Sequence, residues 1–171
     1  MFNPDDDEPE IKVPSEVIDN LRGILGGLPP QEHYLIQFDI NTFSDFYNEF
    51  GPEQSAVVIN GITQYLGRLE GNRDVDYGAR VKQDQFVILS NNPHLGDILN
   101  EWISNHEFPL ARSDLAPVGK LNPQHVRVHT GVMAFTPRPD LSLEQMLTRL
   151  ADICQEAYEN DPQIKYEAWQ R

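Results

Sequence analysis

The sequence predicts one α+β domain in which helices flank a central, mainly antiparallel sheet. Strand-like runs alternate along the chain with amphipathic helical segments. Two of these runs, 75–81 and 85–89, are separated by only three residues, which is the spacing of a β-hairpin. The chain has 171 residues, of which 39% are hydrophobic, so it can form one packed core and wholesale disorder is excluded.

The first half of the domain is expected to place one strand among three helices. Over 15–28, apolar residues recur at the spacing of an amphipathic helix, which Pro29 and Pro30 end. Residues 34–40 are apolar, aromatic or β-branched and are typical of a buried strand. The segments 42–50 and 53–70 each present an apolar face, and Gly51 with Pro52 separates them into two helices.

The second half begins with the hairpin and continues with alternating helices and strands. A helix is expected over 95–104, followed by an irregular connection over 107–124 that contains three prolines and a glycine. The longest strand covers 126–135. A capping box, Ser142 with Gln145, opens a helix over 142–160, and a last strand covers 164–169. No internal repeat or second domain is visible in this pattern.

The charge of the chain is strongly acidic and unevenly placed. Acidic residues number 27 against 13 basic ones, a net charge of −14. This balance disfavours binding to nucleic acid or to anionic membranes, because both need many Lys and Arg side chains. Five acids lie within the first ten residues beside Pro4 and Pro9. Residues 1–14 are therefore expected to form a flexible acidic tail, and 15–171 the folded domain.

The cysteine count and the lack of targeting signals favour the cytoplasm. Cys154 is the only cysteine, so no internal disulfide can form, and its helical context predicts a buried, inert thiol. The N-terminus lacks the basic and apolar regions of a signal peptide, and no stretch reaches the ~20 apolar residues of a membrane span.

Two carboxylates stand where a magnesium site could form. Asp39 lies near the end of a predicted central strand, and Asp84 lies at the tip of the predicted hairpin. Carboxylates that converge from a strand end and a hairpin can hold Mg²⁺, which prefers oxygen ligands and often shares them with phosphate. The alternative is that both are ordinary turn aspartates.

Four segments together resemble the GGDEF domain of bacterial diguanylate cyclases. They are FDINTFSDFYNEFG (38–51), RVKQDQFVIL (80–89), VRVHTGVMAF (126–135) and LEQMLTRLADICQEA (143–157), in the family's order and at its distances. The resemblance covers roughly residues 15–170 and implies the nucleotidyl-cyclase-like fold, with a ferredoxin-like palm. It also implies that Asp39 and Asp84 occupy the family's metal-ligand positions.

The signature itself is altered at almost every other position. Lys82 and Gln83 replace two glycines whose backbone amides would approach the nucleotide phosphates. Gln85 replaces the signature glutamate. Other departures fall on positions that read guanine or contact phosphate in the family: Tyr47, Ala56, Ser44 and Glu159.

These departures predict a protein that is not an enzyme. Condensing two GTP molecules requires base recognition, phosphate binding and metal charge together. Asp39 and Asp84 are then the remains of a metal site, and no cofactor is required. A further hypothesis is that Lys82 acts as an internal counter-ion for these two carboxylates, which would otherwise repel each other.

One binding motif of the family is kept. Many members carry R-x-x-D five residues before the first signature glycine as a site for cyclic di-GMP, and Arg73 and Asp76 stand at that spacing. An arginine can donate two hydrogen bonds to guanine, and an aspartate can accept from its N1 and N2 groups. Arg80 is also kept, and Arg112 is a candidate to complete the site. The alternative is that Arg73 and Asp76 form a surface ion pair.

The leading prediction is an inactive GGDEF-like domain that binds cyclic di-GMP through Arg73 and Asp76 and signals to a partner protein. Since the family often binds the ligand as a stacked pair between two domains, dimerisation on binding is expected. Two alternatives remain: an interaction module that binds no nucleotide, and a domain that binds GTP at Asp39 and Asp84 without turnover. A second R-x-x-D, Arg149 to Asp152, is expected to be a pair on a helix surface. His125 and His129 lie too far apart along one strand to share a metal.

Overall fold

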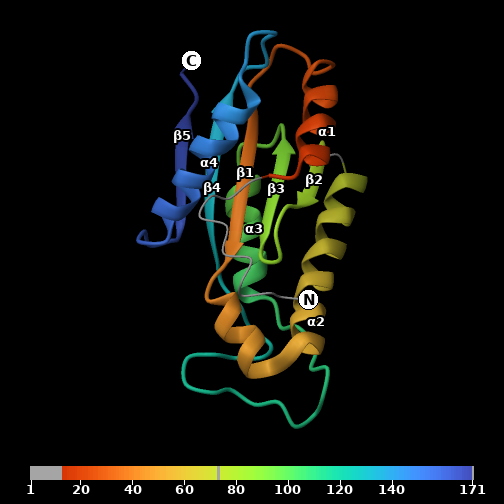
Figure 1. Cartoon of the computed structure of the whole chain (residues 1–171), viewed down its shortest axis with the longest axis vertical. Helices are drawn as coiled ribbons and strands as arrows, with labels where there is room; N and C mark the ends of the chain where they lie inside the picture. The colour runs from red at the N-terminus through yellow and green to blue at the C-terminus, as the bar shows by residue number, and fades with distance from the viewer. Residues whose placement is uncertain (1–12, 73, 171) are drawn as a thin grey trace.

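The computed structural model describes residues 13–72 and 74–170, and its helices and strands alternate in the predicted order (Figure 1). The acidic segment 1–12 and Arg73 lie outside the described residues. The helices are α1 (Ser15–Leu25), α2 (Phe43–Gly71), α3 (Leu95–Asn105) and α4 (Leu143–Ala157). The strands are β1 (His33–Ile40), β2 (Tyr77–Arg80), β3 (Gln85–Ser90), β4 (Val128–Phe135) and β5 (Ile164–Ala168).

The strands form one five-stranded sheet in the order β2-β3-β1-β4-β5. Only β4 and β5 run parallel, so the prediction of a mainly antiparallel sheet is confirmed. Asp39, near the end of β1, stands opposite Gln85 on β3 and opposite His129 on β4. Paired residues of antiparallel strands point to the same face of a sheet, so these three side chains share one face.

The two faces of the sheet are covered by different helices (Figure 1). Residues such as Ile36 and Phe38 pack against α2 and α3, whereas Leu35, which precedes Ile36 and points to the opposite face of β1, packs against α1 and α4. The alternation of side chains along the strand thus divides the core into two layers. Asp39, in register with Leu35, belongs to the α1 and α4 side.

The helix α2 bends at Gly51. This residue has φ 86° and ψ 175°, a conformation that glycine adopts and side chains disfavour, and Pro52 follows it. The two helices predicted over 42–50 and 53–70 are therefore the two arms of α2. Tyr47 lies on the first arm and Ala56 on the second.

The connection between α3 and β4 is irregular, as predicted, and one buried side chain anchors it. Gln54 donates hydrogen bonds to the carbonyls of Pro109 and Pro123, at 2.9 and 2.7 Å, and accepts one from the amide of Ala111 at 2.7 Å. The connection is thereby fixed to the start of the second arm of α2. Within the described residues, no helix is long and apolar enough to cross a membrane.

Candidate functional site

The end of β1 and the turn between β2 and β3 bring the two predicted metal ligands into one neighbourhood. The amide of Ile40 donates to the carbonyl of Asp84 at 2.9 Å, so the strand end and the turn are joined by backbone. Burial raises the pKa of the Asp84 carboxyl, and the negative charge of Asp39 raises it further. The turn backbone, His129 and Lys82 oppose this shift.

Arg80 holds the turn of the hairpin closed. Its Nε donates to the carbonyls of Lys82 and Gln83, at 3.1 and 2.9 Å. Through these bonds the Arg80 side chain is tied to the turn, at the end of β2 farther from Asp76. Lys82 makes no ion pair with Asp39 or Asp84 in the described part of the chain. The titratable nitrogen close to Asp39 is instead Nε2 of His129.

A cavity of about 500 Å³ lies between α2 and the hairpin. Four positions at which the sequence departs from the GGDEF pattern line it: Tyr47, Ala56, Lys82 and Gln83. Sequence positions that lie far apart therefore converge on one site, the location expected for the nucleotide. The lining contains the cationic side chains of Arg80 and Lys82 and no carboxylate. Such a cavity attracts an anion.

Of the predicted cyclic di-GMP ligands, the structure describes Asp76, Arg80 and Arg112, and these three lie apart in one copy of the chain. Asp76 is exposed immediately before β2, where its amide donates to the carbonyl of Leu89 at 2.8 Å. Arg80 follows four residues later, ~13 Å along the strand. Arg73 lies outside the described residues, so its distance from Asp76 is not described.

Arg112 lies at the other end of α2 from Asp76. Its Nε is 3.5 Å from a carboxylate oxygen of Asp114, and its neighbour Ala111 is bonded to Gln54. The 17 residues from Gln54 to the end of α2 at Gly71 span ~26 Å, and Asp76 follows that end. Within one copy of the chain, Arg112 therefore cannot join a site built on Asp76.

A buried polar cluster surrounds Asp39 on the α4 side of the sheet. The amides of Gln37 and Gln85 donate to its two carboxylate oxygens, each at 3.2 Å, and His129 Nε2 lies 3.6 Å from Oδ2. Cys154 is completely buried, and its thiol donates to the carbonyl of His129 at 3.3 Å. Burial, followed by the charge of Asp39, raises the pKa of the Cys154 thiol, as expected for an unreactive cysteine.

The residues around Asp39 fit Mg²⁺ poorly. Mg²⁺ takes oxygen ligands in a near-octahedral arrangement. Next to the Asp39 carboxylate, however, lie a histidine nitrogen, a cysteine sulfur and two amide groups that point their N–H donors at it. The charge of Asp39 helps to raise the pKa of a second carboxyl, that of Asp84. We derive no magnesium-dependent step from this arrangement.

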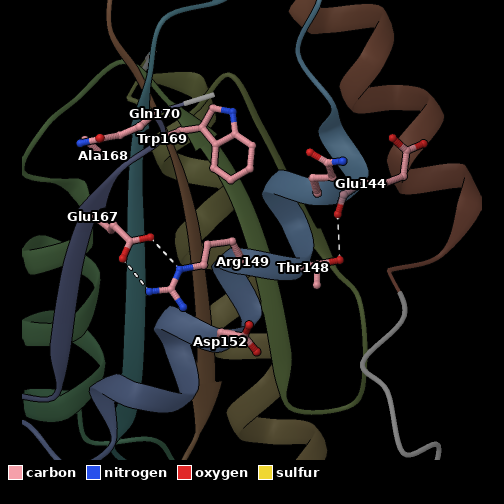
Figure 2. A pocket seen from close by; sticks show the side chains of 9 residues that line it. Glu144, Thr148, Arg149, Asp152, Glu167, Ala168, Trp169 and Gln170 are labelled. Atoms are coloured by element: carbon pink, nitrogen blue, oxygen red, sulfur yellow. Dashed lines mark hydrogen bonds and ion pairs between the residues drawn. The ribbon is translucent and has the colours of Figure 1, made fainter.

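A second cavity, of about 650 Å³, lies between α4 and β5 (Figure 2). Arg149 spans it and donates two hydrogen bonds to Glu167, at 2.6 and 2.7 Å, with a third to Glu156 at 3.4 Å. In Figure 2 the guanidinium points toward Glu167 rather than Asp152. Among the described residues no ion pair joins Arg149 to Asp152, so the predicted pair on one helix surface is wrong. The Glu167 carboxylate on β5 accepts two hydrogen bonds from Arg149 at once, which is more favourable than a single contact with Asp152.

The chain matches the family described as "Diguanylate cyclase, GGDEF domain" over residues 27–163. It therefore belongs to the GGDEF domain family, and the resemblance of the four sequence segments is confirmed. Among curated proteins, none matches the chain in sequence.

Several solved structures share the fold. The GGDEF domain of DgcB from Caulobacter crescentus, in complex with c-di-GMP, has a TM-score of 0.63 and 14% identity, over 89% of this chain and 84% of that one. Diguanylate cyclase SiaD from Pseudomonas aeruginosa, in complex with its activator SiaC, has a TM-score of 0.61 and 16% identity, over 95% of this chain and 61% of that one. The GGDEF domain of the Pseudomonas aeruginosa PA2567 protein has a TM-score of 0.58 and 12% identity, over 92% and 94% of the two chains.

Proposed function

We propose that this chain is a catalytically inactive GGDEF domain that binds cyclic di-GMP at Arg73 and Asp76 and passes the signal to a partner protein. The observation that carries the proposal is the contrast between the two ends of β2. At the hairpin end, other residues replace those with which the family binds its nucleotide substrate. At the other end the R-x-x-D motif is kept.

The composition of the hairpin cavity supports the loss of catalysis. In the position of two glycines, Lys82 and Gln83 place side chains where phosphate would approach backbone amides. Tyr47 and Ala56 replace the asparagine and the acid that would read guanine. Removing one preorganised phosphate donor typically slows a reaction on the order of 10²-fold, and this cavity lacks several such groups.

The position of the R-x-x-D motif supports a receptor role. Asp76 is exposed and sits at the start of β2, held by the backbone bond to Leu89. Because the backbone of Asp76 is fixed at the start of the strand, its exposed carboxylate can face the edge of a bound guanine base. The DgcB domain, which shares this fold, was solved in complex with c-di-GMP.

Titration calorimetry with cyclic di-GMP tests the proposal. We expect saturable binding by the full chain and its loss, by at least about tenfold in affinity, in Arg73→Ala and in Asp76→Ala. The second R-x-x-D provides matched controls, because Arg149→Ala and Asp152→Ala should leave the affinity unchanged. Absence of heat at tens of micromolar ligand would favour an interaction module that binds no nucleotide. Equal binding by Arg73→Ala and the unaltered chain would overturn the assignment of the site.

Because one copy does not bring Arg112 to Asp76, we propose that a second copy completes the ligand site. Sedimentation velocity should then show a dimer that forms only with cyclic di-GMP, and Arg112→Ala should weaken dimerisation more than it weakens the first binding step. A ligand-bound monomer would contradict this arrangement. A pull-down with this chain as bait, with and without cyclic di-GMP, can then identify a protein partner. The SiaD–SiaC complex is the precedent for such a partner.

A second candidate function is binding of GTP in the hairpin cavity without turnover. The cavity lining favours it, because the charged groups among its described residues are Arg80 and Lys82, and both are cationic. Titration with GTP in the presence and absence of Mg²⁺ checks this, with Lys82→Ala as the variant that should weaken binding. Chromatography of the same mixture checks for cyclic product, and measurable turnover would overturn the claim of inactivity.

A further inference from the structure

Three side chains of different chemistry converge beneath α4. One carboxylate oxygen of Asp39, one ring nitrogen of His129 and the sulfur of Cys154 all lie within 4.8 Å of one another. The residues are 6%, 7% and 0% exposed. They come from β1, β4 and α4, so the sheet register and the packing of α4 on the sheet together create the cluster.

A chain of hydrogen bonds determines which nitrogen of His129 faces Asp39. The carbonyl of Tyr158 can only accept, so the amide that meets it at 2.7 Å is Nε2 of Gln163. Gln163 Oε1 is then the acceptor for Asn41 Nδ2 at 2.7 Å, which leaves Asn41 Oδ1 to accept from His129 Nδ1 at 2.6 Å. Since Nδ1 carries the proton in the neutral ring, Nε2 presents its lone pair to Asp39.

Two acceptors therefore face each other in a buried site. The lone pair of His129 Nε2 and Oδ2 of Asp39 are 3.6 Å apart, and this arrangement is unfavourable unless a cation lies between them. A shared proton would draw the two atoms to hydrogen-bond distance, about 2.7–2.9 Å for a charged pair. In contrast, ligands of a tetrahedral zinc ion lie about 3.4 Å apart, given metal–ligand distances of about 2.0–2.2 Å.

The remaining groups also suit a metal of borderline softness. Cys154 can add a thiolate, which zinc accepts and magnesium does not. The two anions, Asp39 and the Cys154 thiolate, would balance the charge of a divalent ion, leaving the buried site neutral. Outer hydrogen bonds of the kind that orient metal ligands are present: His129 Nδ1 donates to Asn41 Oδ1, and the amides of Gln37 and Gln85 donate to Asp39.

One buried acceptor in this cluster is unused. Gln85 is 7% exposed, and its Oε1 has no hydrogen-bond partner among the residues that the structure describes. Its amide nitrogen is bonded to Asp39 Oδ2, so the free oxygen lies next to the cluster. A water in the fourth position of a metal ion could donate to it.

We propose that Asp39, His129 and Cys154 form a binding site for a divalent transition metal, with zinc as the best match. This site is separate from the hairpin cavity and does not depend on the binding of any nucleotide. Next to the site lies Tyr158, a residue that is 40% exposed, and its ring packs edge-on against His129 with ring centres 5.2 Å apart. Binding releases the thiol proton to solvent.

Zinc titration of the metal-free full chain, in competition with a chromogenic chelator, tests the proposal. The chelator suppresses weak binding by the acidic tail. We expect one zinc per chain, and at least about a tenfold loss of affinity in Cys154→Ser, His129→Gln and Asp39→Asn. His125→Gln and Asp84→Asn are the controls and should bind zinc as the unaltered chain does. Zinc binding that survives all three ligand substitutions, or that Asp84→Asn abolishes, overturns the site.

Cobalt substitution gives a second measurement that needs no variant. A Co²⁺ ion bound by Cys154 should show the near-ultraviolet thiolate charge-transfer band together with visible bands of a tetrahedral ion. Absence of the thiolate band excludes Cys154 as a ligand and overturns the proposal. Absence of any metal binding, with His129 protonated in the metal-free chain by NMR, identifies a proton as the cation at this position and also overturns it.

Discussion

At the end of β1, the two faces of the sheet differ in the side chains that surround them and in their access to solvent. On the α2 side, an open cavity is lined by Arg80 and Lys82 together with Tyr47 and Ala56. On the α4 side, Asp39 is enclosed by donors from two glutamines and by His129. The contrast teaches that neighbouring residues of one motif can have different surroundings, since Asp39 is buried among polar side chains while the hairpin residues line an open cavity.

The largest expected difference between the faces is in stability. Removing the buried His129 ring leaves a cavity and takes the donor away from Asn41 Oδ1, at a combined cost of about 2–5 kcal/mol. His129→Ala should lower the free energy of unfolding by this amount in metal-free protein, measured by urea denaturation. His125→Ala, on an exposed position, is the control. A loss below about 1 kcal/mol would show that the fold does not depend on the His129 ring or on its bond to Asn41.

A smaller effect is expected where α4 contacts the sheet. A Cβ on Gly131 would lie 2.6 Å from the backbone nitrogen of Cys154, and backbone cannot move aside as a side chain can. Gly131→Ala should therefore cost about 1–3 kcal/mol in denaturation experiments. Gly67, in α2, has no heavy atom within 4 Å of such a Cβ, so Gly67→Ala should instead stabilise by about 0.5–1 kcal/mol. Equal effects of the two substitutions would contradict the close approach.

On the α2 side, removing the Arg80 side chain is expected to lower the free energy of unfolding by about 1 kcal/mol. Arg80→Ala breaks the bonds to the carbonyls of Lys82 and Gln83, which solvent can partly replace. Thermal unfolding measures the change, and the exposed Arg127→Ala provides the comparison. Equal unfolding temperatures for the two variants would show that the Arg80 guanidinium does not stabilise the turn.

Asp84 should show a pH dependence of opposite sign to an ordinary ion-paired carboxylate. Its folded-state pKa is raised above the ordinary aspartate value of 3.8, so the folded chain holds this proton more tightly than the unfolded chain. Its contribution is fully present below that value and is lost as pH rises through the raised pKa. Asp84→Asn should therefore stabilise the domain at neutral pH, by less than about 1 kcal/mol, and be neutral in acid. Denaturation at several pH values checks this, and a destabilised variant at pH 7 would reverse the assignment.

The smallest effect is expected for Lys82. It lines the open cavity, and no ion pair with Asp39 or Asp84 holds it in the described structure, so Lys82→Ala should change stability by no more than about 0.5 kcal/mol. A loss comparable with that of His129→Ala would restore Lys82 as the counter-ion of the two carboxylates.

Local patterns predicted the elements well because each has a local cause. The break at Gly51 and Pro52, the capping of α4 by Ser142 and the hairpin spacing all follow from neighbouring residues. The positions of Tyr47, Ala56, Lys82 and Gln83 followed from the family pattern, and the cavity unites them.

The Asp39 cluster could not be predicted in the same way. Its members lie on three elements, and a shift of one residue in strand register would turn His129 to the other face. Cys154 was expected to be buried, which is confirmed, but nothing local to α4 indicates what lies beneath it. The available signal was the alternation of β4, which puts His129 on the same face as Gly131 and Met133. Arg149 was misassigned for a similar reason, since its partner Glu167 lies on another element.

Because residue 131 is a glycine, α4 can lie directly on β4, and this affects which substitutions the domain tolerates. With the backbone of α4 seated directly on β4, the height of the helix above the sheet at this point is set by a contact of main chain with main chain. Exposed residues of α4 take no part in that contact, so substitutions among them leave the sulfur of Cys154 in place. A side chain at position 131 would instead push α4 away from β4 and move that sulfur.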